Sequence, residues 1–276
     1  MYNLLSQSFK EQEIRLTELI TEAVPAEKVY ILGCTMVQQR TESIFAYDAL
    51  SGRFVSHYYI LVLINKNSAN SNSNLQDKIE NNCRSFIPVT AIVIHTDQFN
   101  DWLAEGHPFA CKVVTIAQNL YDTGIVLPAT PQALDQQALS KINEAQYNAG
   151  INKVQEFLAG ADLYRIREQN KMAAFMLHQA AEQSLHTLFR ISTGLYVNTH
   201  SIDKLIRYCS MVSYKITAIF LRNNEKNEHI FQLLQKAYID SRYKESYLIK
   251  LEDLLTITER VRALELIIKE TYNNLK

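Results

Sequence analysis

The stretch of residues 171–194 constrains the fold of this chain more than any other segment. Its apolar side chains recur at helical spacing, in a stripe broad enough to face a core: Ala173, Leu177, Ala181, Leu185 and Leu188. Gly194 is a typical helix C-cap. On the same helix, His178, Glu182 and His186 recur every four residues, which places them on one polar ridge. The pattern predicts a central helix packed on its neighbours. Its polar ridge is the first candidate for a functional site in this part of the chain.

Composition and charge indicate an ordinary globular protein. Apolar residues make up 47% and charged residues 21% of 276 residues, enough for two domains with separate cores. The formal net charge of −1 argues against a general attraction to nucleic acid or membrane, and leaves a local basic patch open. The four cysteines form no C-x-x-C pair, as expected of buried thiols in a reducing compartment. With no signal peptide and no apolar run of roughly 20 residues, we expect a cytoplasmic protein without a membrane partner.

The first part of the chain alternates helical and strand patterns. Runs rich in β-branched and aromatic residues predict strands at 29–32, 57–64 and 89–96. Amphipathic patterns predict helices at 9–24, 76–86, 97–105 and 109–119. The Asn/Ser tract 65–74 predicts an exposed loop. The alternation predicts a small α/β domain over residues 1–128, with a sheet of few strands.

The second part of the chain shows helical patterns and no strand pattern. Pro128 and Pro131 bracket the predicted linker, 127–137. Helices are predicted at 138–158, 171–194, 201–208 and 230–242, followed by a long last helix through Leu254, Ile257, Val261, Leu264, Ile268 and Leu275. Short connections favour antiparallel neighbours, so residues 132–276 are expected to form an up-and-down bundle. The fold class predicted for the whole chain is therefore α+β.

Three segments of the second part, in this order, resemble the HEPN domain, an α-helical bundle named for nucleotide binding in higher eukaryotes and prokaryotes. Residues 174–182 read Ala-Phe-Met-Leu-His-Gln-Ala-Ala-Glu, and residues 199–205 read Thr-His-Ser-Ile-Asp-Lys-Leu. Residues 233–243 read Leu-Leu-Gln-Lys-Ala-Tyr-Ile-Asp-Ser-Arg-Tyr. The resemblance implies a homodimer formed through the bundle, a nucleotide or RNA ligand, and a link to toxin–antitoxin or defence systems.

The first part resembles the minimal nucleotidyltransferase domain that often precedes HEPN in bacteria, through residues 27–33, 56–63 and 109–122. That family holds nucleotide phosphates on a Gly-Ser turn and binds Mg²⁺ with carboxylates on the following strands.

Here the corresponding turn reads Gly33-Cys34-Thr35, and the carboxylate pair falls on His57 and Tyr59. The strand 89–94 adds no acid. Oxygen ligands for a hard cation are missing, so we expect a degenerate transferase site that holds no metal or cofactor and performs no transfer.

HEPN ribonucleases carry an Arg followed, after four to six residues, by a His. At the aligned helix end, Arg242 is followed by no histidine. Arg222 and His229 match the spacing, but they stand upstream, in and beside the polar stretch 222–228. Such short motifs arise readily by chance, so a metal-independent HEPN ribonuclease is the alternative function and not the leading one.

The residues expected to bind a ligand are Arg242, Tyr243 and Lys244, which offer a guanidinium fork, an aromatic ring and an amine to a phosphate-bearing molecule. Arg242 pairing with Asp240 or Glu245 at the helix end is an equal alternative.

His178 and Glu182 are expected to neighbour this site. Together with His186 they fit a metal site less well than a solvated ridge or a set of interhelical hydrogen bonds. His200 and Asp203 are assigned to an N-terminal cap made by Thr199 or Ser201.

Taken together, these patterns predict a non-catalytic, nucleotide- or RNA-binding regulator whose functional surface is a cleft between two bundles. A ribonuclease and a purely structural assembly module are the two alternatives.

Overall fold

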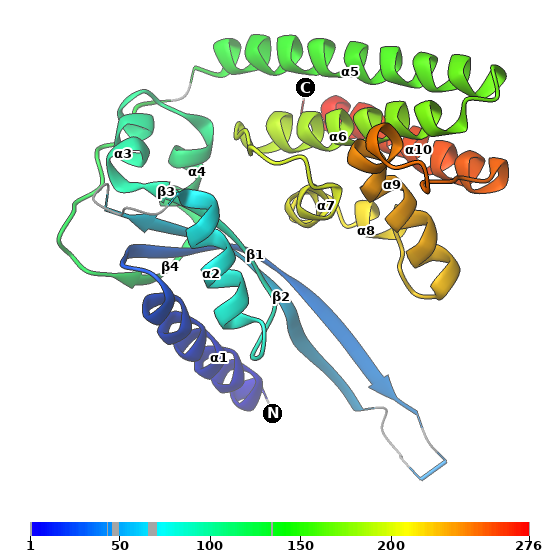
Figure 1. The fold of residues 1–276 in the computed structure, drawn as a ribbon. Coiled ribbons are helices and arrows are strands. Elements are labelled where there is room, and N and C mark those ends of the chain that lie inside the picture. Colours follow the sequence, from blue (N-terminus) through cyan, green and yellow to red (C-terminus); the bar gives the residue numbers. More distant parts are fainter. Residues whose placement is uncertain (1, 43, 46–49, 66–70, 134, 276) are drawn as a thin grey trace. The chain divides into compact units, whose positions relative to one another are not determined.

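The computed structural model describes residues 2–42, 44–45, 50–65, 71–133 and 135–275 (Figure 1). The chain divides into two compact units, Met1–Leu134 and Asp135–Lys276. In the described residues, the strands lie in the first unit and the second unit is helical. The predicted α+β fold class, a mixed α/β region followed by a helix bundle, is confirmed. None of the described helices combines the length and apolarity that a bilayer crossing requires.

The first unit is built on a four-stranded sheet in the order β3-β2-β1-β4. Its strands are β1 (Ala26–Thr41), β2 (Leu50–Ile64), β3 (Val89–His95) and β4 (Gln118–Asp122). β1 runs antiparallel to β2 and β4, and β3 runs parallel to β2. The parallel pair needs a crossover, which α2 (Asn72–Cys83) supplies.

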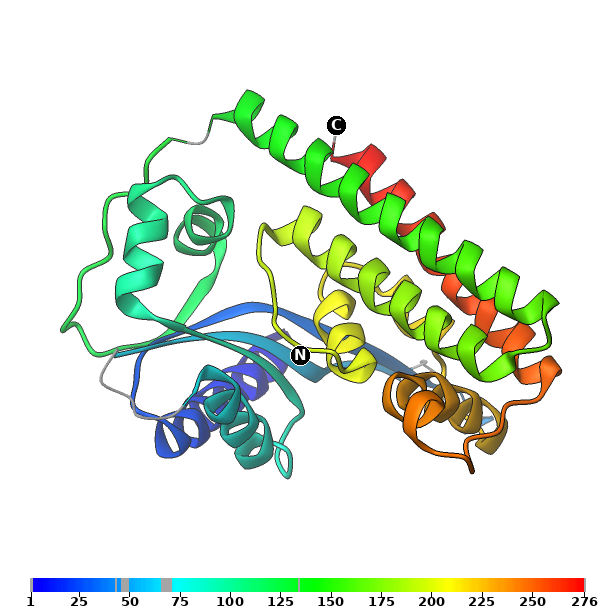
Figure 2. The same cartoon turned by 45° about the horizontal axis from the view of Figure 1, so that its top comes forward.

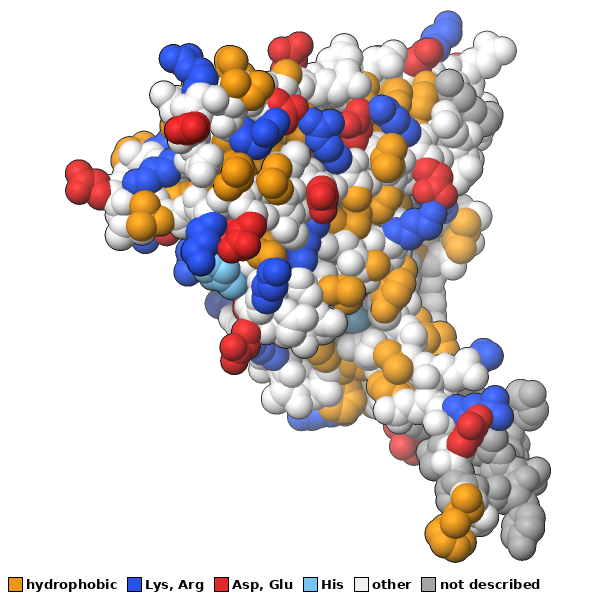
Figure 3. Space-filling view, turned by 90° about the vertical axis from the view of Figure 1, so that its right-hand side faces the viewer, with side chains coloured by type: hydrophobic (Ala, Val, Ile, Leu, Met, Phe, Trp, Pro, Cys, Tyr) orange, Lys and Arg blue, Asp and Glu red, His pale blue; other side chains and the backbone are white. Residues whose placement is uncertain are grey.

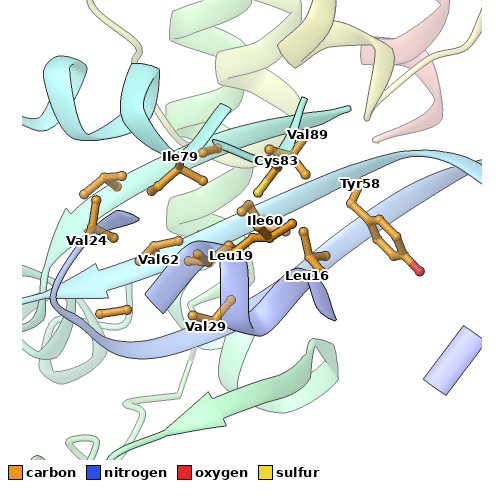
Figure 4. Packing of buried hydrophobic residues seen from close by; sticks show 14 of the residues in the cluster. Leu16, Leu19, Val24, Val29, Tyr58, Ile60, Val62, Ile79, Cys83 and Val89 are labelled. Atoms are coloured by element: carbon orange, nitrogen blue, oxygen red, sulfur yellow. The ribbon is translucent and has the colours of Figure 1, made fainter. Parts of the chain in front are cut away.

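The core of this unit lies between one face of the sheet and two helices (Figure 4). Leu16 and Leu19 of α1 (Tyr2–Ala23) and Ile79 of α2 meet the alternate β2 residues Ile60 and Val62. This period of two is what places one side of each strand against the helices. On the other face, Phe99 of α3 (Thr96–Ala104) stacks on Tyr30 of β1 at 6.4 Å between ring centroids. α4 (Pro108–Ile116) packs beside α3.

Several predictions for this unit were wrong in extent. The helix expected at 9–24 begins at Tyr2, and the strand expected at 57–64 begins at Leu50. The strand expected at 29–32 runs on to Thr41, because its backbone pairs with β2 along its length. The helix expected at 109–119 stops at Ile116, and the polar edge strand β4 follows. The loop expected at 65–74 ends earlier, since Ser71 caps α2 by accepting a hydrogen bond from the Asn74 amide. Residues 66–70 lie outside the described residues.

The second unit is a helix bundle around α6 (Asn170–Thr193), which packs against four other helices. These are α5 (Gln136–Ile166), α7 (Ile202–Ser210), α9 (Glu225–Tyr243) and α10 (Leu251–Asn274). A short helix that was not predicted, α8 (Lys215–Ile219), follows α7. The central helix is confirmed, and Gly194 ends it at φ 79°, donating its N–H to the Arg190 carbonyl at 2.8 Å.

Helices α5 and α6 run side by side in both ribbon views (Figure 2), joined by the short turn after Ile166. Gly150 of α5 faces Thr187 of α6. A Cβ at Gly150 would lie 2.9 Å from the Thr187 Cβ, and closer still to its hydroxyl and methyl groups. Thr187 is β-branched and donates to the Gln183 carbonyl at 2.7 Å, so it has little freedom to move aside. The glycine therefore permits the close approach of these two helices.

We predict that Gly150→Ala destabilises the second unit by about 1–3 kcal/mol, because the added methyl group overpacks the contact with Thr187. The matched control is Gly160→Ala on the same helix, where the nearest atom is the flexible Met176 Sδ at 3.4 Å. There alanine gains helix propensity, and stability should be equal or up to about 1 kcal/mol higher. Urea unfolding curves measure both variants. Equal effects of the two substitutions would contradict the close contact.

Candidate functional site

The three segments that carry the family resemblance meet around the ring of Tyr238 on α9. His200, in the loop before α7, stacks on Tyr238 with ring centroids 5.6 Å apart and an interplanar angle of 5°. From α6, His178 contacts the same ring at 5.5 Å and Phe175 at 6.2 Å. We call these residues, with Glu182 and Arg242, the Tyr238 cluster.

Arg242 is held against this ring one helical turn after it. Its Nε donates to the Tyr238 carbonyl at 2.7 Å, and its Cζ lies 4.4 Å from the centre of the Tyr238 ring. The Tyr243 and Phe175 rings follow at 5.0 and 5.2 Å.

The alternative in which Arg242 pairs with Asp240 or Glu245 is wrong. Lys244 takes Asp240 at 2.9 Å, and no carboxylate among the described residues ion-pairs with Arg242. The guanidinium is exposed, oriented and uncompensated by an acid.

The polar ridge of α6 is buried and not solvated, which corrects the expectation of a wet surface. Glu182 is 4% exposed and His178 is 1% exposed. Glu182 lies 3.0 Å from His200 Nδ1 and 3.6 Å from His178 Nε2, while His178 Nδ1 donates to the Leu234 carbonyl at 2.9 Å. Burial raises the pKa of the Glu182 carboxyl, but its contacts with the two histidines outweigh burial and hold that pKa below its ordinary value. The ridge is therefore an interhelical hydrogen-bond set, the other reading that the sequence left open.

His186, the third residue of the ridge, serves a different contact. Its Nε2 donates to the Thr199 carbonyl at 3.1 Å, and its ring stacks on Tyr196 at 5.2 Å. Burial lowers the pKa of His186 more than the nearby Glu182 carboxylate raises it. The three ridge residues thus do not converge on one point, and the described part of the chain contains no group of three ligands that could hold a metal ion.

The N-terminal cap predicted at α7 is confirmed, with Ser201 accepting from the Lys204 amide at 3.3 Å. Asp203, in the first turn, binds Arg222 at 2.7 Å.

The stretch 222–228 is not all loop, since Asn224 caps α9 and the helix begins at Glu225. His229 lies in that helix and faces Asp253 at 3.8 Å. Arg222 and His229 are therefore directed at different carboxylates and are not brought together as a pair.

The model of the HEPN domain matches residues 147–270. These residues form a HEPN domain. The match contains all three segments of the Tyr238 cluster and lies within the second unit. No curated protein shows a match to this chain.

In the first unit, the residues of the expected transferase site lie on neighbouring strands. Gly33 pairs with Tyr59, and Thr35 pairs with His57. The His57 and Tyr59 rings are 4.9 Å apart. His57 Nε2 lies 2.8 Å from the Thr90 hydroxyl.

The phosphate-holding turn expected at Gly33-Cys34-Thr35 does not form, because these residues continue β1 and their backbone pairs with β2. Cys34 pairs with Tyr58, so strand alternation directs it to the opposite face from His57 and Tyr59.

Sequence reasoning missed Tyr238 and Phe175 as site residues and gave His200 a capping role only. The signal was present, because all three lie in the segments that resemble the HEPN domain, and Tyr238 precedes Arg242 by one helical turn. Arg242 contacts the Tyr243 ring, and Tyr238 lies between Arg242 and His178, which is followed by Glu182. Lys244 is turned to Asp240.

We predict that the HEPN domain loses stability as pH falls below about 6.5, because the pKa of buried His186 is lower in the folded than in the unfolded chain. The unfolded chain then binds more protons, which favours unfolding. The lowered pKa of Glu182 acts in the same direction below about 4.5. Urea midpoints at pH 7.5 and 5.5 measure the effect, which His186→Gln should reduce. The control is His229→Gln, at a side chain 62% exposed, which should keep the wild-type difference. An unchanged pH difference in His186→Gln would count against this assignment.

Proposed function

We propose that the HEPN domain is a non-catalytic binding module for a nucleotide or RNA. The observation that carries the proposal is Arg242, which is fixed by the Tyr238 carbonyl and three aromatic rings yet pairs with no described carboxylate. A planar guanidinium with free N–H groups matches a phosphate in two-point hydrogen bonding.

The neighbours of Arg242 fit the same ligand. The Tyr243 side chain is 74% exposed beside the guanidinium and offers a face for base stacking. Lys244 adds positive charge that Asp240 partly neutralises. The buried His178 contacts the Tyr238 ring, and the buried Glu182 contacts His200, so both hold the residues next to Arg242 in position.

The local geometry around Arg242 supports the nucleotide or RNA ligand, whereas a large positively charged surface does not contribute to this proposal. Basic and acidic side chains alternate on the face shown in Figure 3, and the net charge is −1. A protein without a large basic surface gains little from general counterion release, so oriented contacts must supply most of the affinity.

The proposed site is completed by a second copy of the HEPN domain. Ile239 and Tyr243 stand one turn apart on α9 and are 57% and 74% exposed, which gives apolar surface beside Arg242. A two-fold axis at this surface would duplicate each Arg242 and form a cleft from two flat faces. Light scattering on the purified protein tests the homodimer.

The alternative ribonuclease receives less support. Arg222 and His229 each face an acid of another helix, and Arg222 also lies over the Phe231 ring at 4.3 Å. The second alternative is a purely structural assembly module. It would form the same dimer as the proposed binding module but would bind no ligand. The link to toxin–antitoxin or defence systems follows from the family resemblance.

We also propose that residues 1–128 are a degenerate nucleotidyltransferase-like domain, with the bundle domain at 132–276. His57 and Tyr59 stand where the family places carboxylates, and they contact Thr90 and Thr35. Imidazole and phenol groups are poor ligands for Mg²⁺, so these contacts support packing and not metal chemistry.

We predict that Arg242→Ala weakens binding of a dye-labelled oligouridylate or of ATP about tenfold or more, the equivalent of one charge-assisted contact. The control is Arg190→Ala, an exposed arginine about four turns from Phe175 along α6, which should change affinity little. Fluorescence anisotropy measures the RNA and calorimetry the nucleotide, with circular dichroism to show that each variant is folded.

Absence of binding by the wild-type protein would favour the assembly module. Cleavage of the RNA that disappears in His229→Ala would favour the ribonuclease.

We further predict that the protein transfers no nucleotide, because its first unit lacks carboxylates at His57 and Tyr59. Incubation with labelled ATP and Mg²⁺ should leave no label on protein or RNA. Label that appears reproducibly and is lost in a Gly33 or Cys34 variant would show that the site is active.

A further inference from the structure

His200 presents an exposed ring nitrogen beside the same aromatic ring as Arg242. Its ring lies flat on Tyr238, and Arg242 Cζ lies 4.4 Å from the centre of that ring. The His200 side chain is 62% exposed, while its partner Glu182 is 6% exposed. Nδ1 is 3.0 Å from the Glu182 carboxylate, and Nε2 has no hydrogen-bond partner among the residues described here. The imidazole is thus fixed on one side and open on the other.

The Glu182 contact determines which nitrogen carries the first proton. An ionised carboxylate only accepts hydrogen bonds, so the neutral imidazole must carry its proton on Nδ1. The lone pair is then on Nε2. A second proton can only add at Nε2, which turns this atom from an acceptor into a cationic donor.

We propose that His200 is a second phosphate-recognition residue of the HEPN domain, acting in its protonated form beside Arg242, with Glu182 as its positioning residue. The proposal rests on the proposed function of this surface. It makes binding of a phosphate-bearing ligand stronger as pH falls, because a second proton gives the ring a positive charge and gives Nε2 a hydrogen to donate.

The charged and titratable groups around His200 are consistent with this role. α6 places Glu182 beside it, with His178 and His186 beyond, and α9 places Tyr238 and Arg242. Asp203 of α7 is occupied by Arg222. Protonated His200 and Arg242 would be two cations beside one aromatic ring. A bound phosphate would relieve the opposition between the two cations, so ligand and proton should bind cooperatively.

The test measures anisotropy of an oligouridylate that carries a pH-insensitive dye and no terminal phosphate, at pH 8.0 and pH 5.5 and constant ionic strength. The phosphodiesters of this probe do not titrate in that range. Wild-type protein should bind about tenfold more tightly at pH 5.5, the gain of one charge-assisted contact. His200→Gln should lose that gain. His200→Lys, a cation at both pH values, should bind equally tightly at both.

Two further variants separate a ligand contact from a structural role. His229→Gln, at a histidine with the same 62% exposure, should keep the pH gain. Glu182→Gln should reduce the gain, provided that circular dichroism shows a folded chain. The histidine side-chain NMR spectrum at pH 8.0 should show His200 protonated on Nδ1.

Each failure has a distinct meaning. A pH gain that persists in His200→Gln, or an Nε2–H tautomer, overturns the role of His200. A wild-type affinity that depends on Arg242 but not on pH overturns it too and leaves the proposed function standing. No binding of the probe at either pH overturns both proposals.

Discussion

The buried carboxylate of Glu182 is the constraint on which the arrangement of the HEPN domain depends. A carboxylate at 4% exposure is costly unless groups of opposite or donating character surround it. His200 meets this demand from the loop before α7 at 3.0 Å, while His178 of α6 lies 3.6 Å from the second carboxylate oxygen, beyond hydrogen-bond distance. His178 is anchored in turn to the Leu234 carbonyl of α9. The Glu182–His200 contact links α6 to the loop before α7, and the His178–Leu234 hydrogen bond links α6 to α9.

Arg242, an exposed residue of the Tyr238 cluster, is held in place through contacts that lead back to the buried His178 and Glu182 side chains. Tyr238 is covered by two histidines whose positions Glu182 sets, and Arg242 rests on Tyr238 in turn. An arginine on a helix surface normally samples many rotamers, and ordering it costs free energy when a ligand binds. Here the backbone contact and three rings hold Arg242 in place before any ligand arrives. In the proposed binding role, this preorganisation would lower the entropy cost of ordering Arg242 on a ligand.

In the first unit, one face of the sheet forms the core, and the other face carries His57 and Tyr59. Ile60 and Val62 pack on the face of the sheet that α1 and α2 cover. The His57 and Tyr59 side chains make hydrogen bonds to threonines, in the positions that the nucleotidyltransferase resemblance assigns to metal-binding carboxylates. β1 passes straight through the segment expected to turn. Because β1 stays extended and pairs with β2 through residues 33–35, it forms no turn whose successive backbone N–H groups could converge on a phosphate.

The sequence by itself determined the elements whose signals are local. The spacing of Leu177, Leu185 and Leu188 and the Gly194 cap defined α6 almost to the residue, since periodicity and capping act within a few turns. It also singled out Arg242 and Tyr243 as candidate ligand-binding residues. Only the tertiary structure decided that β1 extends to Thr41, because strand length depends on a partner strand. Only it showed that the His178–Glu182 ridge is buried, because a polar row at helical spacing reads the same whether water or another helix covers it. His200 and Tyr238 are 38 positions apart in the printed sequence, and no local rule joins them. Their contact exists because α6 and α9 pack together and the buried Glu182 carboxylate holds His200 from the loop between α6 and α7.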